Sequence, residues 1–155
     1  MVRRPRVGDS GGFSVVELVV TLGIMAVVLA IVIPRLSPQP RYFDADLREF
    51  ADNLQVARQW AMSRTTHYRL RVTSTSAYVI EQGVLSGSIW TFPTITRSVT
   101  LHARIGFAAG DVGKAAEFSS RGAMVGTTLT FSLTNSEGGS TKSILVYATG
   151  MVETQ

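Results

Sequence analysis

The sequence contains no cysteine and only two histidines, His67 and His102. The absence of cysteine excludes disulfides and thiolate metal sites, and two separated histidines without an acidic cluster do not form a metal-binding pattern. There is no Gly-x-Ser-x-Gly nucleophile elbow and no phosphate-binding glycine-rich loop before a helix. The sequence therefore predicts no metal, no cofactor and no enzymatic activity.

Charged side chains are missing from residues 18–34. As a helix, residues 13–33 would measure roughly 30 Å, which is the thickness of one bilayer core. Arginines at positions 3, 4 and 6 precede this stretch and predict a cytoplasmic N-terminus, with the C-terminal part across the inner membrane. Within the expected helix 13–33, Glu17 is the one charged residue. A carboxylate near the start of an apolar membrane helix costs about 2.5 to 3.5 kcal/mol on insertion, and it usually marks a functional site with a partner. On hydropathy alone, a plain single-pass anchor remains open.

A strong positive charge is also missing. The formal net charge of the 155 residues is +4, but it falls to +2 if residues 1–12, which hold three arginines and one aspartate, are removed. Little charge then remains to attract an acidic partner.

Gly12, Phe13 and Glu17 belong to the stretch Gly-Phe-Ser-Val-Val-Glu-Leu-Val-Val, which resembles the cleavage and methylation signature of type IV pilins and type II secretion pseudopilins. The resemblance implies that a prepilin peptidase cuts between Gly12 and Phe13, and that the new amine of Phe13 is methylated. It also implies a helix kink at Pro34. In a filament, Glu17 would neutralise the Phe13 amine of a neighbouring subunit, so that neither charge stays unpaired in an apolar core.

Five parts are predicted along the chain: a leader (1–12), a transmembrane helix (13–33), a proline-rich kink (34–41), an amphipathic helix (42–65) and an antiparallel β domain (66–155). Prolines 34, 38 and 40 predict the kink or break. The amphipathic helix is predicted by apolar residues at spacings of three and four, with Trp60 and Met62 completing its packing. On its wet face, Asp44 is expected to pair with Arg48. The apolar residues of this helix form one stripe, which consists of Phe43, Leu47, Phe50, Leu54, Ala57 and Ala61.

After residue 66 the apolar period changes from helical to two, which predicts strands. Tyr68, Leu70 and Val72 begin a hairpin whose second strand covers residues 77–81. A short strand near 89–92 is expected to end before Pro93, and residues 99–105 alternate as another strand. Residues 108–116 are small and weakly patterned, which predicts a mobile surface loop. A last pair of strands is expected at 129–133 and 143–148.

A long helix followed only by strands predicts an α+β fold, in which the helix packs on antiparallel sheets. Three segments, residues 54–61 with Arg58, 118–122 and 145–150, resemble the GspH/FimT-type minor pseudopilin domain. The pilin-like resemblance implies a subunit held by membrane lipid in the inner membrane, then drawn into a short periplasmic filament that helps export folded proteins. Its implied partners are the prepilin peptidase/methyltransferase, other pseudopilins, an inner-membrane secretion or pilus platform, and the exported protein.

A minor type IV pilin, in pilus assembly or DNA uptake, is the competing interpretation. Arg64, Arg69 and Arg71 cluster near His67 and Tyr68, and basic and aromatic side chains together can hold a phosphate backbone. The alternating pattern equally fits a solvated strand face. DNA-binding members of the family carry arginines after a glycine near the C-terminus, but here Gly150 is followed by Met-Val-Glu-Thr-Gln, so DNA is not the expected partner.

Overall fold

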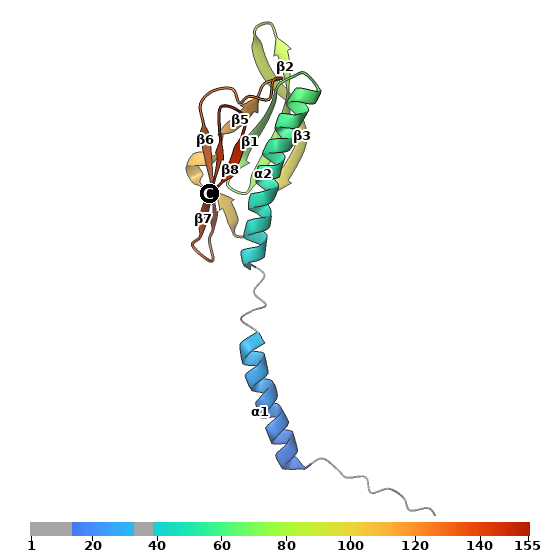
Figure 1. Ribbon diagram of the computed structural model, residues 1–155, viewed down its shortest axis with the longest axis vertical. Coiled ribbons are helices and arrows are strands. Elements are labelled where there is room, and N and C mark those ends of the chain that lie inside the picture. The colour runs from blue at the N-terminus through green and yellow to red at the C-terminus, as the bar shows by residue number, and fades with distance from the viewer. Residues whose placement is uncertain (1–13, 33–38) are drawn as a thin grey trace, which may run out of the picture. The chain divides into compact units, whose positions relative to one another are not determined.

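The computed structural model describes residues 14–32 and 39–155, and the chain divides into two compact units, Met1–Pro38 and Gln39–Gln155. The described part of the first unit is helix α1, Val15–Val32 (Figure 1). No helix within the described residues combines the length and the apolar character that crossing a bilayer requires. The predicted kink residue Pro34 lies outside the described residues.

The second unit is built on helix α2, Gln39–Ser63. Pro40 is its second residue, and proline is tolerated there because a backbone N–H in the first turn has no acceptor within the helix. The apolar stripe predicted from the sequence is confirmed, because all six of its side chains are buried. Trp60 is partly buried against the core, whereas Met62 is 41% exposed, so the packing role expected for Met62 is wrong.

Two four-stranded antiparallel sheets accompany α2, which confirms the α+β prediction. The first sheet has the order β3-β2-β1-β5, and the second has the order β4-β6-β7-β8. The strands are β1 (Tyr68–Ser74), β2 (Ala77–Ser86), β3 (Ile89–Thr100), β4 (Ile105–Phe107), β5 (Ala115–Phe118), β6 (Leu129–Asn135), β7 (Thr141–Val146) and β8 (Val152–Thr154), with a short 3₁₀ helix η2 at Ala109–Asp111.

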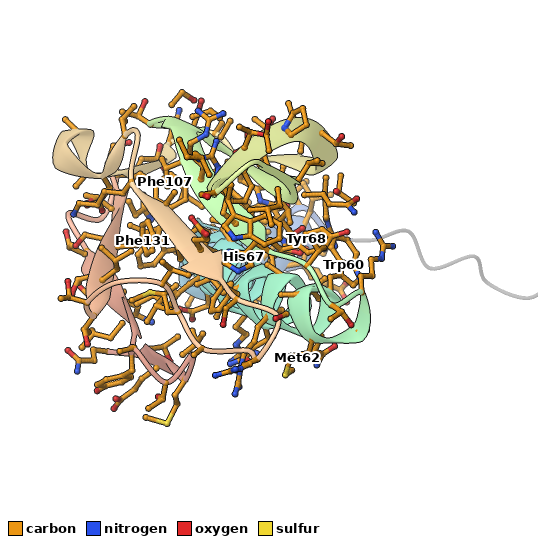
Figure 2. All side chains as sticks on the ribbon, turned by 90° about the horizontal axis from the view of Figure 1, so that it is seen from above. Trp60, Met62, His67, Tyr68, Phe107 and Phe131 are labelled. Carbon is orange, nitrogen blue, oxygen red and sulfur yellow. The ribbon has the colours of Figure 1, made fainter. Side chains whose placement is uncertain are left out.

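The core joins α2 to both sheets. Phe50 of α2 packs edge-on against Tyr78 of the first sheet and against Phe131 of the second, with ring centroids 5.0 and 5.3 Å apart. Phe107 of β4 also contacts Phe50, and Phe107 and Phe131 are labelled in Figure 2. Such aromatic contacts add about 0.5–1.5 kcal/mol each beyond their burial. Because every residue of this core lies between positions 43 and 146, the second unit contains its own hydrophobic core.

Acidic residues in the first half of α2 bind side chains of the two sheets and of the turn after β3. Asp44 forms its ion pair with Lys142 of β7 at 2.6 Å, and Arg48, the partner predicted from the sequence, acts on Asp44 only through its charge. This bond with Lys142 lowers the pKa of Asp44. The buried carboxylate of Asp46 accepts hydrogen bonds from the backbone N–H and the ring of His102, at 2.8 and 2.6 Å. Arg97 of β3 reaches Glu49 at 3.2 Å.

Among the differences from the predicted strand boundaries, three have a clear physical reason, while β2 is longer than predicted, β7 is shifted towards the N-terminus and β8 was not predicted. β3 continues through Pro93, because it is an edge strand with a bulge there, and an edge strand tolerates a residue without an N–H. Residues 99–105 do not form one strand, since β3 ends at Thr100 and β4 begins at Ile105. The loop expected at 108–116 instead contains η2 and the start of β5, held by the buried carboxylate of Asp111, which accepts a 2.6 Å bond from the N–H of Ser132.

Candidate functional site: the apolar helix and the basic face of the β domain

Helix α1 presents an exposed apolar surface with one carboxylate near its start. Ser14 caps the helix through a 3.3 Å bond from the N–H of Val16, and Glu17 lies in the first turn. The hydroxyl of Thr21 bonds to the carbonyls of Glu17 and Leu18, at 2.9 Å each, so it needs no partner outside the helix. The exposed large apolar side chains are Val15, Val16, Leu18, Val19, Val20, Leu22, Ile24, Met25, Val27, Val28 and Leu29, each more than half exposed.

An apolar helix surface of this size needs a partner, because a soluble monomer rarely leaves so large a contiguous patch in water. Gly12 and Phe13, the two residues of the predicted cleavage junction, lie outside the described residues, so the structure places only Glu17 of the three signature positions.

The predicted basic cluster divides into two separate arrangements in the structure. Arg64, just beyond α2, lies over the rings of Trp60 and Tyr68, 5.5 and 5.7 Å from their centroids. It also donates a 2.5 Å hydrogen bond to the Tyr68 hydroxyl. These contacts provide a hydrogen-bond donor for the hydroxyl of Tyr68, a buried residue at the start of β1. Arg64 therefore has a structural role that requires no ligand.

Arg69 and Arg71 converge on one buried carboxylate, that of Glu81 on the neighbouring strand β2. Arg69 donates to it at 2.5 Å and Arg71 at 2.6 Å, while the Glu81 side chain is only 4% exposed. Burial raises the pKa of Glu81, but the hydrogen bonds from Arg71 and Arg69 outweigh this effect and hold it below its usual value. The bond with Glu81 also raises the pKa of Arg71. With two cations on one anion, this cluster carries less positive charge than the sequence suggested.

The two histidines bind separate carboxylates. His67 contacts Glu117 at 2.6 Å and stacks on Trp90, with ring centroids 3.9 Å apart, whereas His102 contacts Asp46 and stacks on Tyr42. His67, Tyr68 and Trp60 are labelled in Figure 2. Within residues 14–32 and 39–155, no three acidic or histidine side chains gather as metal ligands would.

Three segments that are far apart in the sequence meet where Arg58 reaches Gly122 and Gly150. The Nε of Arg58 donates a 2.9 Å hydrogen bond to the carbonyl of Gly122. Gly150 has φ +82°, and a Cβ at this position would overlap the same carbonyl and lie 2.9 Å from Arg58 Nε. These are the segments that carry the GspH/FimT-type resemblance. No pattern in the sequence indicates that they touch, since spacing along a chain does not reveal contacts between a helix and distant loops.

The fold is similar to that of solved pilin-type proteins. The type IV minor pilin FimU of Pseudomonas aeruginosa superposes with a TM-score of 0.60 at 17% identity, covering 76% of this chain and 91% of FimU. The minor pseudopilin EpsH of the Vibrio cholerae type 2 secretion system gives a TM-score of 0.56 at 16% identity, covering 73% of this chain and 95% of EpsH. No protein-family model and no curated protein sequence matches the chain. At these identities the similarity establishes the fold, and the chain has the pilin-like α+β fold that the sequence predicted.

Proposed function

We propose that this chain is a minor pseudopilin subunit of a type II protein secretion system, which assembles into a short periplasmic filament that helps export folded proteins. The observation that carries the proposal is the combination of two parts in one chain. An exposed apolar helix with Glu17 in its first turn precedes a β domain with the fold of a minor pilin and a minor pseudopilin. Its work is mechanical assembly, and we propose no catalytic activity.

The exposed surface of α1 supports both stages of this function. Before assembly, membrane lipid would cover the apolar side chains, with the N-terminus in the cytoplasm and the β domain in the periplasm. After assembly, the helices of other pseudopilins would replace the lipid. Glu17 is costly in either environment unless it is paired, and the amine of Phe13 in a neighbouring subunit would supply the pairing charge.

Processing at the Gly12–Phe13 bond is the step on which this function depends. A prepilin peptidase/methyltransferase would remove residues 1–12 and methylate Phe13, and an inner-membrane platform would then draw the subunit into the filament. The test is the N-terminal mass of the protein isolated from the envelope of its native host. A chain beginning at N-methylated Phe13 supports the proposal, whereas a chain that still begins at Met1 refutes it.

The role of Glu17 can be tested separately from processing. Glu17→Ala should still be cleaved, but should be lost from sheared or crosslinked filaments, because the Phe13 amine then has no partner. Thr21→Ala is the matched control, since the Thr21 hydroxyl bonds only to carbonyls of its own helix. Equal incorporation of Glu17→Ala and Thr21→Ala would exclude the assembly role.

A minor type IV pilin is the second candidate, because the fold is similar to that of FimU as well as EpsH. Deleting the gene in its native host separates the two functions. Loss of secreted proteins from the medium with surface pili retained supports the pseudopilin, whereas loss of pili or of DNA uptake with secretion retained supports the pilin. If the chain is instead a plain membrane-anchored binding domain, deleting its gene would affect neither secretion nor pili.

A further inference from the structure

The first sheet packs against α2 with one face, and its other face, the outer face, carries charged side chains (Figure 1). Because Leu70 is buried and strand side chains alternate, its neighbours Arg69 and Arg71 lie on the outer face. Glu81 of β2 and Glu117 of β5 lie on the same face, since each pairs directly with Arg69. The formal charges of the two arginines and the two glutamates, which form the charged row, therefore cancel.

Two aromatic side chains of β3 reach across this outer face. The ring of Trp90 stacks on His67, with centroids 3.9 Å apart and 11° between the ring planes. The centroid of the Phe92 ring lies 4.1 Å from the guanidinium carbon of Arg69. β2 runs between the contacting residues, and a Cβ at its Gly83 would come within 3.1 Å of both the Phe92 ring and the Cβ of His67. The missing side chain of Gly83 therefore leaves the space that these contacts use.

Leu85 and Ile95 extend this apolar surface along the strands. Leu85 pairs directly with Trp90 and Ile95 with Glu81, so both point to the outer face. Their exposed fractions are 53% and 58%. From Trp90 to Ile95 the strand covers roughly 16 Å, which is about the length of three sugar rings in an extended chain. The outer face thus has an exposed apolar strip, formed by Leu85, Trp90, Phe92 and Ile95, beside the charged row.

The charged side chains are held in place but keep unused hydrogen-bonding groups. Arg69 donates to Glu81 only through Nε, whereas Arg71 donates through Nε and Nη2. Glu117 uses only Oε1, in its contact with His67. Within the described part of the chain, the remaining Nη groups of both arginines and Oε2 of Glu117 have no protein partner. Since these three side chains are only 24–34% exposed, their donors and acceptors are preorganised for a ligand.

These features together specify the chemistry of the ligand. Nucleic acid and anionic lipid require a surplus of positive charge, which the charged row does not provide. The centre of a protein interface is usually depleted of charged side chains, whereas the outer face carries four. A sugar ring has a C–H face that packs on aromatic rings, and its hydroxyls both donate to carboxylates and accept from guanidinium groups. We infer that the outer face of the first sheet binds an extended, uncharged polysaccharide, with sugar rings on the apolar strip and hydroxyls on the charged row.

Calorimetry with the full-length chain, in a detergent without a sugar headgroup, tests the binding. The probes are chitohexaose and cellohexaose, which are extended and uncharged. At least one of them is expected to bind at submillimolar concentration, and the acidic chain hexagalacturonate should bind about tenfold more weakly. No binding of either neutral probe at millimolar concentration overturns the inference, as does stronger binding of the acidic chain.

The two tryptophans of the chain, Trp60 and Trp90, show where the probe binds. In the Trp60→Phe variant the tryptophan fluorescence comes from Trp90 alone, and it should shift when the probe binds. In the Trp90→Phe variant the fluorescence of Trp60 should not shift, because Trp60 packs against the core near the end of α2. A shift of Trp60 without a shift of Trp90 overturns the inference.

Trp90→Ala and Tyr42→Ala are matched substitutions, because each ring stacks on a histidine that contacts a carboxylate. Trp90→Ala should weaken binding about tenfold, whereas Tyr42→Ala should leave it within about twofold. Trp90→Phe keeps a flat ring and should weaken binding by no more than about threefold. Equal effects of the two alanine substitutions overturn the inference.

Ile95→Ala tests the apolar strip even if Trp90→Ala does not fold, because the Ile95 side chain is largely exposed. It should weaken binding about threefold with an unchanged circular dichroism spectrum, and unchanged affinity would contradict the role of the strip. The inference does not depend on the proposed function, since the purified chain is tested outside a filament. Its failure therefore leaves cleavage at Phe13, and the function that depends on it, unaffected.

Discussion

Replacing Gly150 by alanine is expected to destabilise the β domain by about 3–6 kcal/mol. A non-glycine residue at φ +82° costs about 1–2 kcal/mol. The added Cβ would also overlap the carbonyl of Gly122, and would crowd the Nε of Arg58 that donates to this carbonyl. Loss of a hydrogen bond from a charged donor costs about 1.5–3 kcal/mol, and the forced backbone shift adds to it. The total is a large fraction of the 5–15 kcal/mol that typically stabilises a domain.

Gly139→Ala is the control that separates the two contributions. Gly139 also has positive φ, +61°, but no atom lies within 4 Å of the Cβ that alanine would add. It should therefore lose only the backbone contribution, about 1–2 kcal/mol. The difference in the free energy of unfolding between the two variants, about 2–4 kcal/mol, is the cost of placing a Cβ at the Arg58–Gly122–Gly150 junction.

The assay is thermal unfolding of the fragment Gln39–Gln155, which contains the whole core, followed by circular dichroism. At about 4 °C per kcal/mol for a domain of this size, the midpoint of Gly150→Ala should lie roughly 8–16 °C below that of Gly139→Ala. Arg58→Ala should cost about 1.5–3 kcal/mol alone, but much less in the Gly150→Ala background, where its bond is already lost. Midpoints within about 3 °C of each other, or additive effects of Arg58→Ala and Gly150→Ala, would refute this account of the junction.

Three further outcomes are expected. Glu81→Gln should lower the free energy of unfolding by about 2–4 kcal/mol near neutral pH, because it leaves Arg69 and Arg71 without their charged partner; a loss below about 0.5 kcal/mol in urea unfolding would contradict this. The pKa of Glu81 in the folded state lies below its ordinary value of 4.5, so the ionised carboxylate contributes fully to folding stability above pH 4.5. This contribution is lost as the pH falls through the folded pKa. The difference in the free energy of unfolding between wild type and Glu81→Gln should therefore shrink in acid. Duplex DNA should show no salt-dependent binding to the β domain in fluorescence anisotropy, because Arg69 and Arg71 already bind Glu81, whose charge offsets one of their two. Binding that weakens with salt and is lost in Arg69→Ala/Arg71→Ala would reverse the ranking of pilin and pseudopilin functions.

The parts of the fold that the sequence predicted are those whose pattern is local. Burial of one helix face and of alternate strand residues repeats every few positions, so the stripe of α2 and the hairpin that begins with Tyr68, Leu70 and Val72 could be recognised without knowing their partners. The clustering of Arg69 with Arg71 was visible for the same reason, because both lie on one strand.

Features that depend on distant contacts could not be predicted in this way. Pro93 indicates the end of a strand unless the strand is known to lie at an edge, and edge position depends on the order of strands in the sheet. The segment around Asp111 looked mobile because its anchor, the N–H of Ser132, belongs to another strand. Asp44 had a suitable partner on its own helix but pairs with Lys142, and the charge of Glu81 became decisive only once it was seen to be buried beneath two arginines.

The three acidic residues near the start of α2 have a mechanical consequence. A force that pulls the chain at Gln39 enters the β domain through the first turns of this helix, where Asp44 is tied to β7, Asp46 to the turn after β3, and Glu49 to β3 itself. Each exposed pair contributes little at equilibrium. Under load, however, the three contacts would share the tension and pass it to both sheets, so that a pull at Gln39 would act on the domain as a whole instead of separating the helix from its core.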